Sequence, residues 1–142
     1  MKGAQIRITR DRSSLSADQL VGFFVGWPNP PTSTTLLQIL TAAHVVSLAW
    51  SHDRIVGFVY AISDGVLSAY IPLLEVLPEH QGHGLGSRLV KDILAQLDDL
   101  YMIDLVCDPE LEKFYKPHGF TMLAGMARRN YANQSGAKQF II

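Results

Sequence analysis

This 142-residue sequence has only one cysteine, almost no net charge and no long apolar run. The single cysteine, Cys107, excludes an internal disulfide and is typical of a protein kept in a reducing compartment. A formal net charge of −1 offers no basic surface of the kind that nucleic acid requires. No apolar run approaches the ~18 residues of a membrane span, and residues 1–5 lack the apolar stretch of a signal peptide. We therefore expect a cytoplasmic protein with neither nucleic acid nor a membrane as its partner.

Metal ligands are sparse as well. The five histidines are scattered and one cysteine cannot build a cysteine-rich cluster, so no metal site is expected. What the sequence does contain is apolar residues, at 48% of the total, which is enough for a packed core and argues against disorder. The length suits one domain of ordinary size, so residues 1–142 are interpreted as a single domain.

A glycine-dense loop that opens directly into a helix is the most informative feature. Residues 81–86 read Gln-Gly-His-Gly-Leu-Gly, and they follow a strand-like segment, residues 73–77, that ends at Pro78. The expected helix has one apolar face, formed by Leu85, Leu89, Val90, Ile93, Leu94 and Leu97. Glycine lets the backbone approach an anion, and the first turn of a helix presents N–H groups without internal partners. The pattern predicts a phosphate-binding loop.

Two familiar phosphate loops fit this stretch poorly. A nucleoside-triphosphate loop needs a lysine and then a serine or threonine after its last glycine, whereas Ser87 and Arg88 follow Gly86. A dinucleotide fold needs G-x-G-x-x-G, and the last step here is one residue short. Asp104 stands where that fold places its acidic residue, but too little chain follows it to build the remaining parallel units.

A third loop fits best. The pattern Gln81-x-x-Gly84-x-Gly86 resembles the pyrophosphate loop of the GCN5-related N-acetyltransferases, the GNAT superfamily. Residues 114–120, Phe-Tyr-Lys-Pro-His-Gly-Phe, are similar to the second signature of that family, an aromatic pair on a short helix followed by Gly-Phe at the start of a strand. The two signatures occur in the family's order and separation. The resemblance implies an acetyl-CoA-dependent N-acetyltransferase that moves an acetyl group to a primary amine by direct attack in a ternary complex.

Periodicity and turn signals divide the chain into short elements. Strands are expected at residues 6–9, 45–50, 55–62, 66–77 and 101–106, with further strands beginning at 119 and 126. Helices are expected at residues 16–24, 34–43 and 85–97, with a short one around 114. The fold class is α/β (α+β). The resemblance implies the GNAT fold, a central mixed, mostly antiparallel sheet of about six to seven strands flanked by about four helices and splayed between strands 4 and 5.

The resemblance also implies how acetyl-CoA is held. The residues that would bind its pyrophosphate, through backbone N–H groups and the serine hydroxyl, are Gln81, Gly82, His83, Gly84, Leu85, Gly86 and Ser87. The pantetheine arm would pair, as an added strand does, with the edge at Val76 and Leu77, where a free N–H could also polarise the thioester carbonyl. Pro72 precedes this edge and is consistent with a break in the strand, or with an ordinary edge strand.

Two side chains are predicted to move protons. By the resemblance, Tyr115 matches the tyrosine beside the CoA sulfur and would act as general acid, with packing as an ordinary core aromatic as the alternative. Glu75 is the predicted general base. Strand alternation puts its side chain on the same side as Leu73 and Leu77, which is the cleft side if the strand borders the cleft. A plain solvated carboxylate is the alternative.

The acceptor is expected over the first helices and the late strands. The candidate substrate contacts are Phe24, Trp27 and Tyr70, unless they are core aromatics. Residues 26–28, Gly-Trp-Pro, also resemble a stretch of the serotonin-type N-acetyltransferases, which suits an arylalkylamine held by Glu75 or Asp64. We expect a small amine as acceptor, with protein lysine as a second option, and a homodimer, since family members often pair through C-terminal strands. A non-catalytic acyl-CoA-binding sensor and a nucleotide-binding regulator remain alternative functions.

Overall fold

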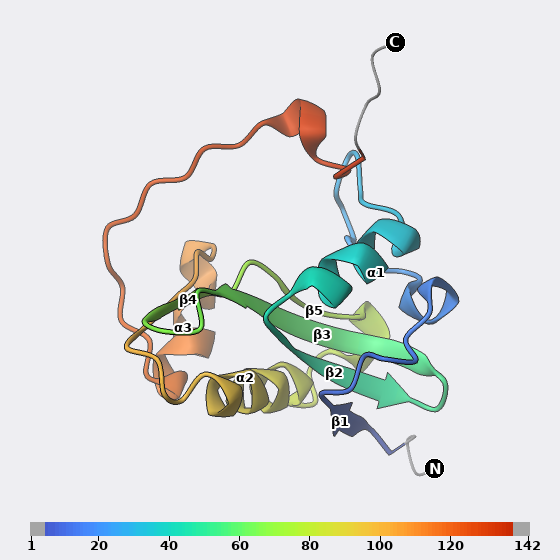
Figure 1. Ribbon diagram of the computed structural model, residues 1–142, viewed down its shortest axis with the longest axis horizontal. Helices are drawn as coiled ribbons and strands as arrows, with labels where there is room; N and C mark the ends of the chain where they lie inside the picture. Colours follow the sequence, from blue (N-terminus) through green and yellow to red (C-terminus); the bar gives the residue numbers. More distant parts are fainter. Residues whose placement is uncertain (1–4, 138–142) are drawn as a thin grey trace.

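The computed structural model describes residues 5–137 and contains one six-stranded sheet with helices on both faces (Figure 1). The strands are β1 (Arg7–Thr9), β2 (Val45–Ser51), β3 (Arg54–Ser63), β4 (Ser68–Tyr70), β5 (Leu74–Val76) and β6 (Met102–Asp104). The α-helices are α1 (Ser33–Ala42), α2 (Leu85–Gln96) and α3 (Glu112–Tyr115). The strands lie in the order β1-β2-β3-β4-β6, and β5 pairs with a separate stretch of β3. Every pair is antiparallel except β4 with β6.

The core has two halves because the side chains of β3 alternate between the faces of the sheet. Phe58 faces α1 and lies with Leu36 and Leu40. Val59 faces α2 and lies with Leu89 and Ile93. All of these side chains are fully buried, and the two helices cover opposite faces of the sheet (Figure 1). A strand covered on both faces reads as an almost continuous apolar run, which is how the β3 sequence reads.

Polar contacts fix α2 on the sheet, which matters because the glycine loop leads into this helix. Asp92 accepts hydrogen bonds from the buried hydroxyl of Ser47 at 2.6 Å and from Arg10 at 2.9 Å. One turn further on, Gln96 Nε2 donates to the backbone carbonyl of Val46 at 2.8 Å. The helix is therefore tied to β2 by directional bonds as well as by apolar packing, and its N-terminus has a defined place above β5.

The predicted hairpin and two predicted helices are confirmed. β2 and β3 pair through a tight turn at residues 51–54. α1 begins one residue earlier than expected, because the side chain of Thr32 accepts the backbone N–H of Thr35 at 3.1 Å and caps the first turn. α2 ends within one residue of the expected position. No helix in residues 5–137 has the length and apolarity needed to cross a bilayer.

The helix expected at residues 16–24 is wrong beyond its first turn. Residues Ala17–Leu20 form a single 3₁₀ turn, in which Gln19 Oε1 accepts the backbone N–H of Ser16 at 2.9 Å, as the capping box predicts. The chain leaves helical geometry at Val21, with φ of −80° and ψ of 142°, and Gly22 and Phe24 follow with left-handed φ of 101° and 63°. The carboxylate of Glu75, 51 residues away, accepts the N–H of Phe24 and so holds the chain in this non-helical path.

The long strand expected at residues 66–77 is divided into β4 and β5. The N–H of Ile71 donates to the carbonyl of Asp104 at 2.9 Å, just past the three-residue register of β4 with β6. Pro72 comes next and has no N–H to continue the ladder. β5 stays on β3, while β6 ends at Asp104 and is shorter than the expected strand. β5, the second half of the expected fourth strand, and β6, the expected fifth strand, therefore separate after Pro72. The splay expected for the GNAT fold is confirmed.

The strands expected to begin at residues 119 and 126 are wrong within the described part of the chain. Residues Tyr131–Asn133 form a 3₁₀ turn, and every residue from 121 to 130 is exposed. In Figure 1 this orange-to-red segment arches away from the sheet. Extended chain gains ladder hydrogen bonds only when it lies beside another strand, so the segment forms none here.

Candidate active site

The separation of β5 from β6 leaves one edge of β5 without a paired strand among residues 5–137. Leu77 donates its N–H to the carbonyl of Val56 at 2.8 Å, so the backbone groups of residues 75 and 77 face β3. The backbone groups of Val76 therefore face the slot. Its carbonyl accepts a hydrogen bond from Gln81 Nε2 at 2.9 Å, which ties the glycine loop to the slot edge. The N–H of Val76 remains available to a bound ligand.

Of the two residues expected at this edge, Val76 and Leu77, only Val76 can supply the free N–H, because Val56 already accepts that of Leu77. The expected shared side of Glu75 and Leu77 agrees with their contacts. Leu77 is buried, and its Cδ2 would lie 3.5 Å from a Cβ at Gly22, while Glu75 accepts the N–H of Phe24 in the same loop. The bond from the N–H of Leu77 to Val56 continues the β5–β3 ladder by one residue, as strand alternation requires.

The glycine loop forms an open cradle at the N-terminus of α2. Gly82 and Gly84 have left-handed backbones, with φ of 81° and 78°, and a Cβ added at either would meet no atom within 4 Å. The first backbone bond of the helix runs from the N–H of Arg88 to the carbonyl of Gly84, at 3.1 Å. The N–H groups of residues 85–87 thus have no recorded acceptor within the described chain. Such a helix end is suited to an anion such as a pyrophosphate.

The remaining loop residues have different roles. His83 is exposed, while Leu85 is 5% exposed and directs its side chain into the core, so it can offer a ligand only its backbone. A Cβ at Gly86 would lie 3.3 Å from the ring of Phe114. The last glycine therefore lets α3 pack closely on α2. The sequence analysis assigned Gly86 to pyrophosphate binding alone, and only the tertiary contact reveals its second role.

A second contact joins the two sequence signatures. His118, in the 3₁₀ turn Lys116–His118, lies with Nε2 3.3 Å from the hydroxyl oxygen of Ser87. Burial and then the nearby charge of Lys91 lower the pKa of His118, so its ring is neutral at pH 7 and shares a hydrogen bond with the serine. This contact orients the Ser87 hydroxyl at the mouth of the cradle. Sequence spacing alone does not pair these two side chains.

Tyr115 lies beside the loop because Phe114, its neighbour, packs on Gly86. Its ring makes edge-to-face contacts with Phe114 and Phe120, at centroid distances of 4.8 and 5.7 Å. Burial, and then the nearby thiol of Cys107, raises the pKa of Tyr115 to about 12. The hydroxyl therefore holds its proton throughout the neutral range, as a hydrogen-bond donor must.

Glu75 anchors the loop that replaces the expected second half of the first helix. Both of its carboxylate oxygens accept the N–H of Phe24 at 2.9 Å, and one also accepts the N–H of Val25 at 3.4 Å. These bonds hold Phe24 in its left-handed conformation, which costs a non-glycine residue roughly 1–2 kcal/mol. The structure thus gives Glu75 a positioning role, and its role as general base stays a prediction.

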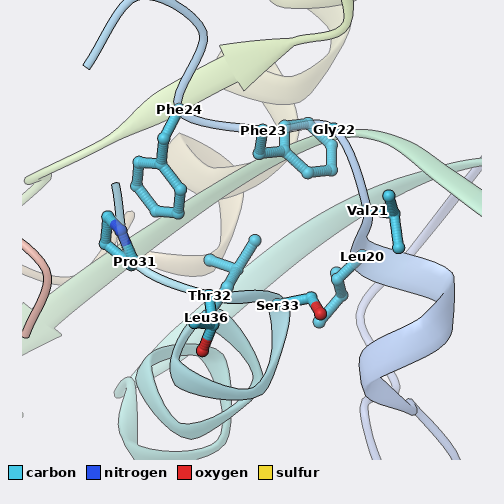
Figure 2. Close-up of a pocket in the computed structure, with 9 residues that line it drawn as sticks. All are labelled: Leu20, Val21, Gly22, Phe23, Phe24, Pro31, Thr32, Ser33 and Leu36. Atoms are coloured by element: carbon cyan, nitrogen blue, oxygen red, sulfur yellow. The ribbon is translucent and has the colours of Figure 1, made fainter. Parts of the chain in front are cut away.

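A cavity of about 120 Å³ lies between the anchored loop and the start of α1 (Figure 2). Its lining is formed by Leu20, Val21, Gly22, Phe23, Phe24, Pro31, Thr32, Ser33 and Leu36. The Trp27 ring packs on Phe24 at 4.9 Å and is 37% exposed. Two of the three predicted substrate contacts therefore lie together beside Glu75. The third, Tyr70, lies on β4 and lines a separate open depression with Asp104.

Asp64 has a structural role in its own turn, and its role in holding an ammonium group stays a prediction. Its Oδ1 accepts the backbone N–H groups of Val66, Leu67 and Ser68 at 2.8, 2.9 and 3.2 Å. These bonds, first the one from Leu67, lower the pKa of Asp64 to about 2. The side chain organises the β3–β4 turn. Over residues 5–137, no three His, Cys, Asp or Glu side chains are grouped so that they could hold a metal ion.

Comparison with known proteins places this site in a family. Residues 13–120 match the family model described as acetyltransferase (GNAT) family. The crystal structure of a presumed acetyltransferase from Deinococcus radiodurans R1 is 45% identical, with a TM-score of 0.91 over 94% of each chain. A GNAT-family acetyltransferase from Streptococcus pneumoniae TIGR4 is 28% identical, with a TM-score of 0.74 over 89% of this chain and 98% of the other.

Curated relatives agree with the structures. The uncharacterised N-acetyltransferase ycf52 of Gracilaria tenuistipitata var. liui is 34% identical over 101 residues, which are 68% of this chain and 56% of the relative. The chain thus spans little more than half the length of such curated relatives, 56% of this one and 58% of the ycf52 protein of Pyropia yezoensis. The matched family region contains β2 to β6, the glycine loop, α2 and α3. The chain belongs to the GNAT family of acetyltransferases.

Proposed function

We propose that the protein is an acetyl-CoA-dependent N-acetyltransferase that acetylates a primary amine by direct attack in a ternary complex. One observation carries the proposal: the open glycine cradle is tied through Gln81 to the slot edge at Val76, and it packs through Gly86 on α3, which carries the protonated Tyr115. The cradle suits a pyrophosphate, and the slot edge suits an extended pantetheine arm. Acetyl-CoA supplies both groups together with an activated acetyl carbonyl.

The chain's own groups then have separate tasks in the transfer. The amine nitrogen forms a bond to the acetyl carbon, and the bond from that carbon to sulfur breaks. The N–H of Val76, which faces the slot, would stabilise the negative charge that develops on the carbonyl oxygen. Two protons move: the ammonium loses one before attack, and the departing thiolate gains one.

Tyr115 is the proposed partner of the departing sulfur. Its pKa of about 12 lies above that of an ordinary thiol, about 8.5, so complete proton transfer from the tyrosine to a thiolate is uphill. The larger contribution is then a hydrogen bond that strengthens as charge builds on the sulfur. A hydrogen bond to a charged group contributes about 1.5–3 kcal/mol. Solvent, or the proton released by the amine, completes the protonation.

The two roles of Glu75 predict different results for two substitutions. Glu75→Gln keeps a carbonyl oxygen for the N–H of Phe24 but removes the basic carboxylate. If Glu75 is the general base, kcat should fall by about 10²-fold or more in this variant. If it only positions the loop, kcat should stay within about threefold for Gln, while Glu75→Ala should raise the acceptor KM and lower the midpoint of thermal unfolding. Steady-state kinetics and calorimetric melting of both variants decide between the roles.

The acceptor is proposed to be a small amine. The cavity beside Glu75, at about 120 Å³, has room for only a few non-hydrogen atoms, since a water molecule occupies roughly 30 Å³ in the liquid. Trp27, which is 37% exposed and packs on the lining residue Phe24, offers a face to an aromatic ring or an ammonium group. A protein lysine, which enters as a single extended side chain, is the second acceptor class to test.

A non-catalytic acyl-CoA sensor is the alternative function. A sensor needs the cradle and the slot but gains nothing from a tyrosine kept protonated beside them. The first experiment is calorimetric titration of the purified protein with acetyl-CoA, with ATP and NAD as controls. Saturable binding selective for acetyl-CoA, followed by CoA release when amines are screened, supports the enzyme. Binding without turnover of any amine or peptide favours the sensor, and selective binding of ATP or NAD contradicts both.

A further inference from the structure

His118 contacts the glycine cradle through its side chain. Its Nε2 lies 3.3 Å from the hydroxyl oxygen of Ser87, in the first turn of α2. Packing fixes the imidazole there, because the ring of Phe114, which packs on Gly86, lies 5.5 Å from the His118 ring between centroids. The turn that carries His118 ends at Gly119, whose left-handed backbone has φ of 92°. Residues of both sequence signatures therefore hold the imidazole beside the cradle.

The Ser87 hydroxyl has a single proton, so its orientation depends on the protonation state of His118. A neutral imidazole either donates a hydrogen bond to the serine or accepts one, according to which ring nitrogen carries the proton. A protonated imidazolium carries a proton on both nitrogens and can only donate. The serine oxygen then accepts from Nε2, and the hydroxyl proton is left to point at an anion in the cradle.

The surroundings of His118 favour a neutral ring in the unliganded protein. Burial, and then the charge of Lys91 one turn along α2 from Ser87, lower the pKa of His118 from its ordinary value of 6.5. Arg88 donates to the carbonyl of Ile6 at 3.2 Å. The other charged or titratable side chains on the neighbouring elements are Glu112, Lys113 and Tyr115 on α3, Lys116 in the turn of His118 itself, and His83 in the glycine loop. A pyrophosphate in the cradle adds negative charge beside the imidazole, and this favours the protonated ring.

We propose that His118 is a positioning residue of the acetyl-CoA site: when the pyrophosphate binds, the ring takes up a proton from solvent and directs the Ser87 hydroxyl at the phosphate oxygens. The inference rests on the proposed function, because it needs a pyrophosphate in the cradle. The pKa of His118 is then higher in the complex than in the unliganded protein. Affinity for acetyl-CoA therefore rises as the pH falls through the bound-state pKa, and levels off below the unliganded value.

The first test measures the dissociation constant for acetyl-CoA by calorimetric titration between pH 8 and pH 6. Wild-type affinity should rise about five- to tenfold over this range. His118→Gln keeps an N–H donor for Ser87 but cannot carry a charge, so its affinity should stay within about threefold of wild type at pH 8 and show no such rise. His44→Gln, at an exposed histidine beside the β3–β4 turn, is the matched control and should keep the wild-type profile.

Proton uptake is a readout that a purely structural role would not change. Titrations at pH 6.5 in buffers of different ionisation enthalpy count the protons that are taken up on binding. The wild type should take up about half a proton more than His118→Gln. The phosphate groups of the ligand titrate in the same way with both proteins, so this difference reports the histidine.

A double-mutant cycle tests whether His118 acts through Ser87. His118→Phe keeps an aromatic ring against Phe114 and removes the hydrogen bond, so at pH 8 it should weaken acetyl-CoA binding about fivefold. In a Ser87→Ala background the same substitution should change affinity by less than about twofold, since the hydroxyl is already absent.

The outcomes separate this inference from the proposed function. Acetyl-CoA binding with the same pH profile and proton uptake in wild type and His118→Gln overturns the inference alone. Loss of the affinity rise in His83→Gln but not in His118→Gln also overturns it, as do additive effects of the His118 and Ser87 substitutions. A wild-type protein that binds no acetyl-CoA at any pH overturns the proposed function and this inference with it.

Discussion

Replacing Gly84 with glutamate is expected to abolish acetyl-CoA binding and leave the fold intact. Gly84 is the N-cap residue of α2, with φ of 78°. A Cβ added at this position would meet no atom within 4 Å. A glutamate would fill the space that the pyrophosphate needs and would add a negative charge beside it. We expect affinity to fall at least 100-fold, about 3 kcal/mol, in a calorimetric titration with acetyl-CoA.

Gly65→Glu is the matched control for this substitution. Gly65 lies in the β3–β4 turn with nearly the same left-handed backbone, φ of 74°, and an added Cβ there would meet only His44, at 3.7 Å. Both variants therefore carry the same backbone strain, roughly 1–2 kcal/mol, and the same change of charge. Only Gly84→Glu should lose binding. Equal affinities for the two variants would contradict the assignment of the cradle.

Tyr115→Phe is expected to lower kcat by about 100-fold while the dissociation constant for acetyl-CoA changes less than about threefold. The substitution removes one hydroxyl and keeps the ring contacts with Phe114 and Phe120. Binding rests on the cradle and the slot edge, which it does not touch. Stopped-time assays of CoA release, together with a titration of acetyl-CoA, separate the two quantities. Tyr101→Phe, at an exposed tyrosine, is the control and should behave as wild type.

The pKa of Tyr115 adds a second readout to the same experiment. Because burial raises this pKa to about 12, the hydroxyl stays protonated through the usual assay range. The tyrosine should therefore cause no loss of wild-type activity on the alkaline side below about pH 10. On the acid side of the pH–rate profile, activity should fall as the acceptor amine becomes protonated, and this fall should appear in both the wild type and the variant. An unchanged kcat in Tyr115→Phe would mean that the ring only packs.

Much of the fold follows from local pattern. Alternation and tight turns predict the hairpin of β2 and β3, and a 3.6-residue period predicts α1 and α2 to within one or two residues. These signals are short-range, because each depends on residues within one or two turns of the same element. The glycine loop belongs to this class, since its spacing and the following helix already predict an anion site.

The predictions that failed concern partners far apart in the chain. The helix expected at residues 16–24 stops after Leu20, and Glu75, 51 residues from Phe24, accepts the N–H of Phe24 in the non-helical loop that follows. Residues 119–131 have strand-like composition, but a strand forms only beside a partner edge, and these residues pair with no strand of the described chain.

The sequence by itself determined the family, the order of the central elements and the position of the anion cradle, because glycine spacing and helix periodicity are local properties. Only the tertiary structure decided that Val76 rather than Leu77 offers its N–H to the slot and that Gly86 admits Phe114. It also decided that Glu75 holds a loop. The physical reason is that backbone bonding direction and close packing depend on which segments meet in space, and residue spacing along the chain does not specify that.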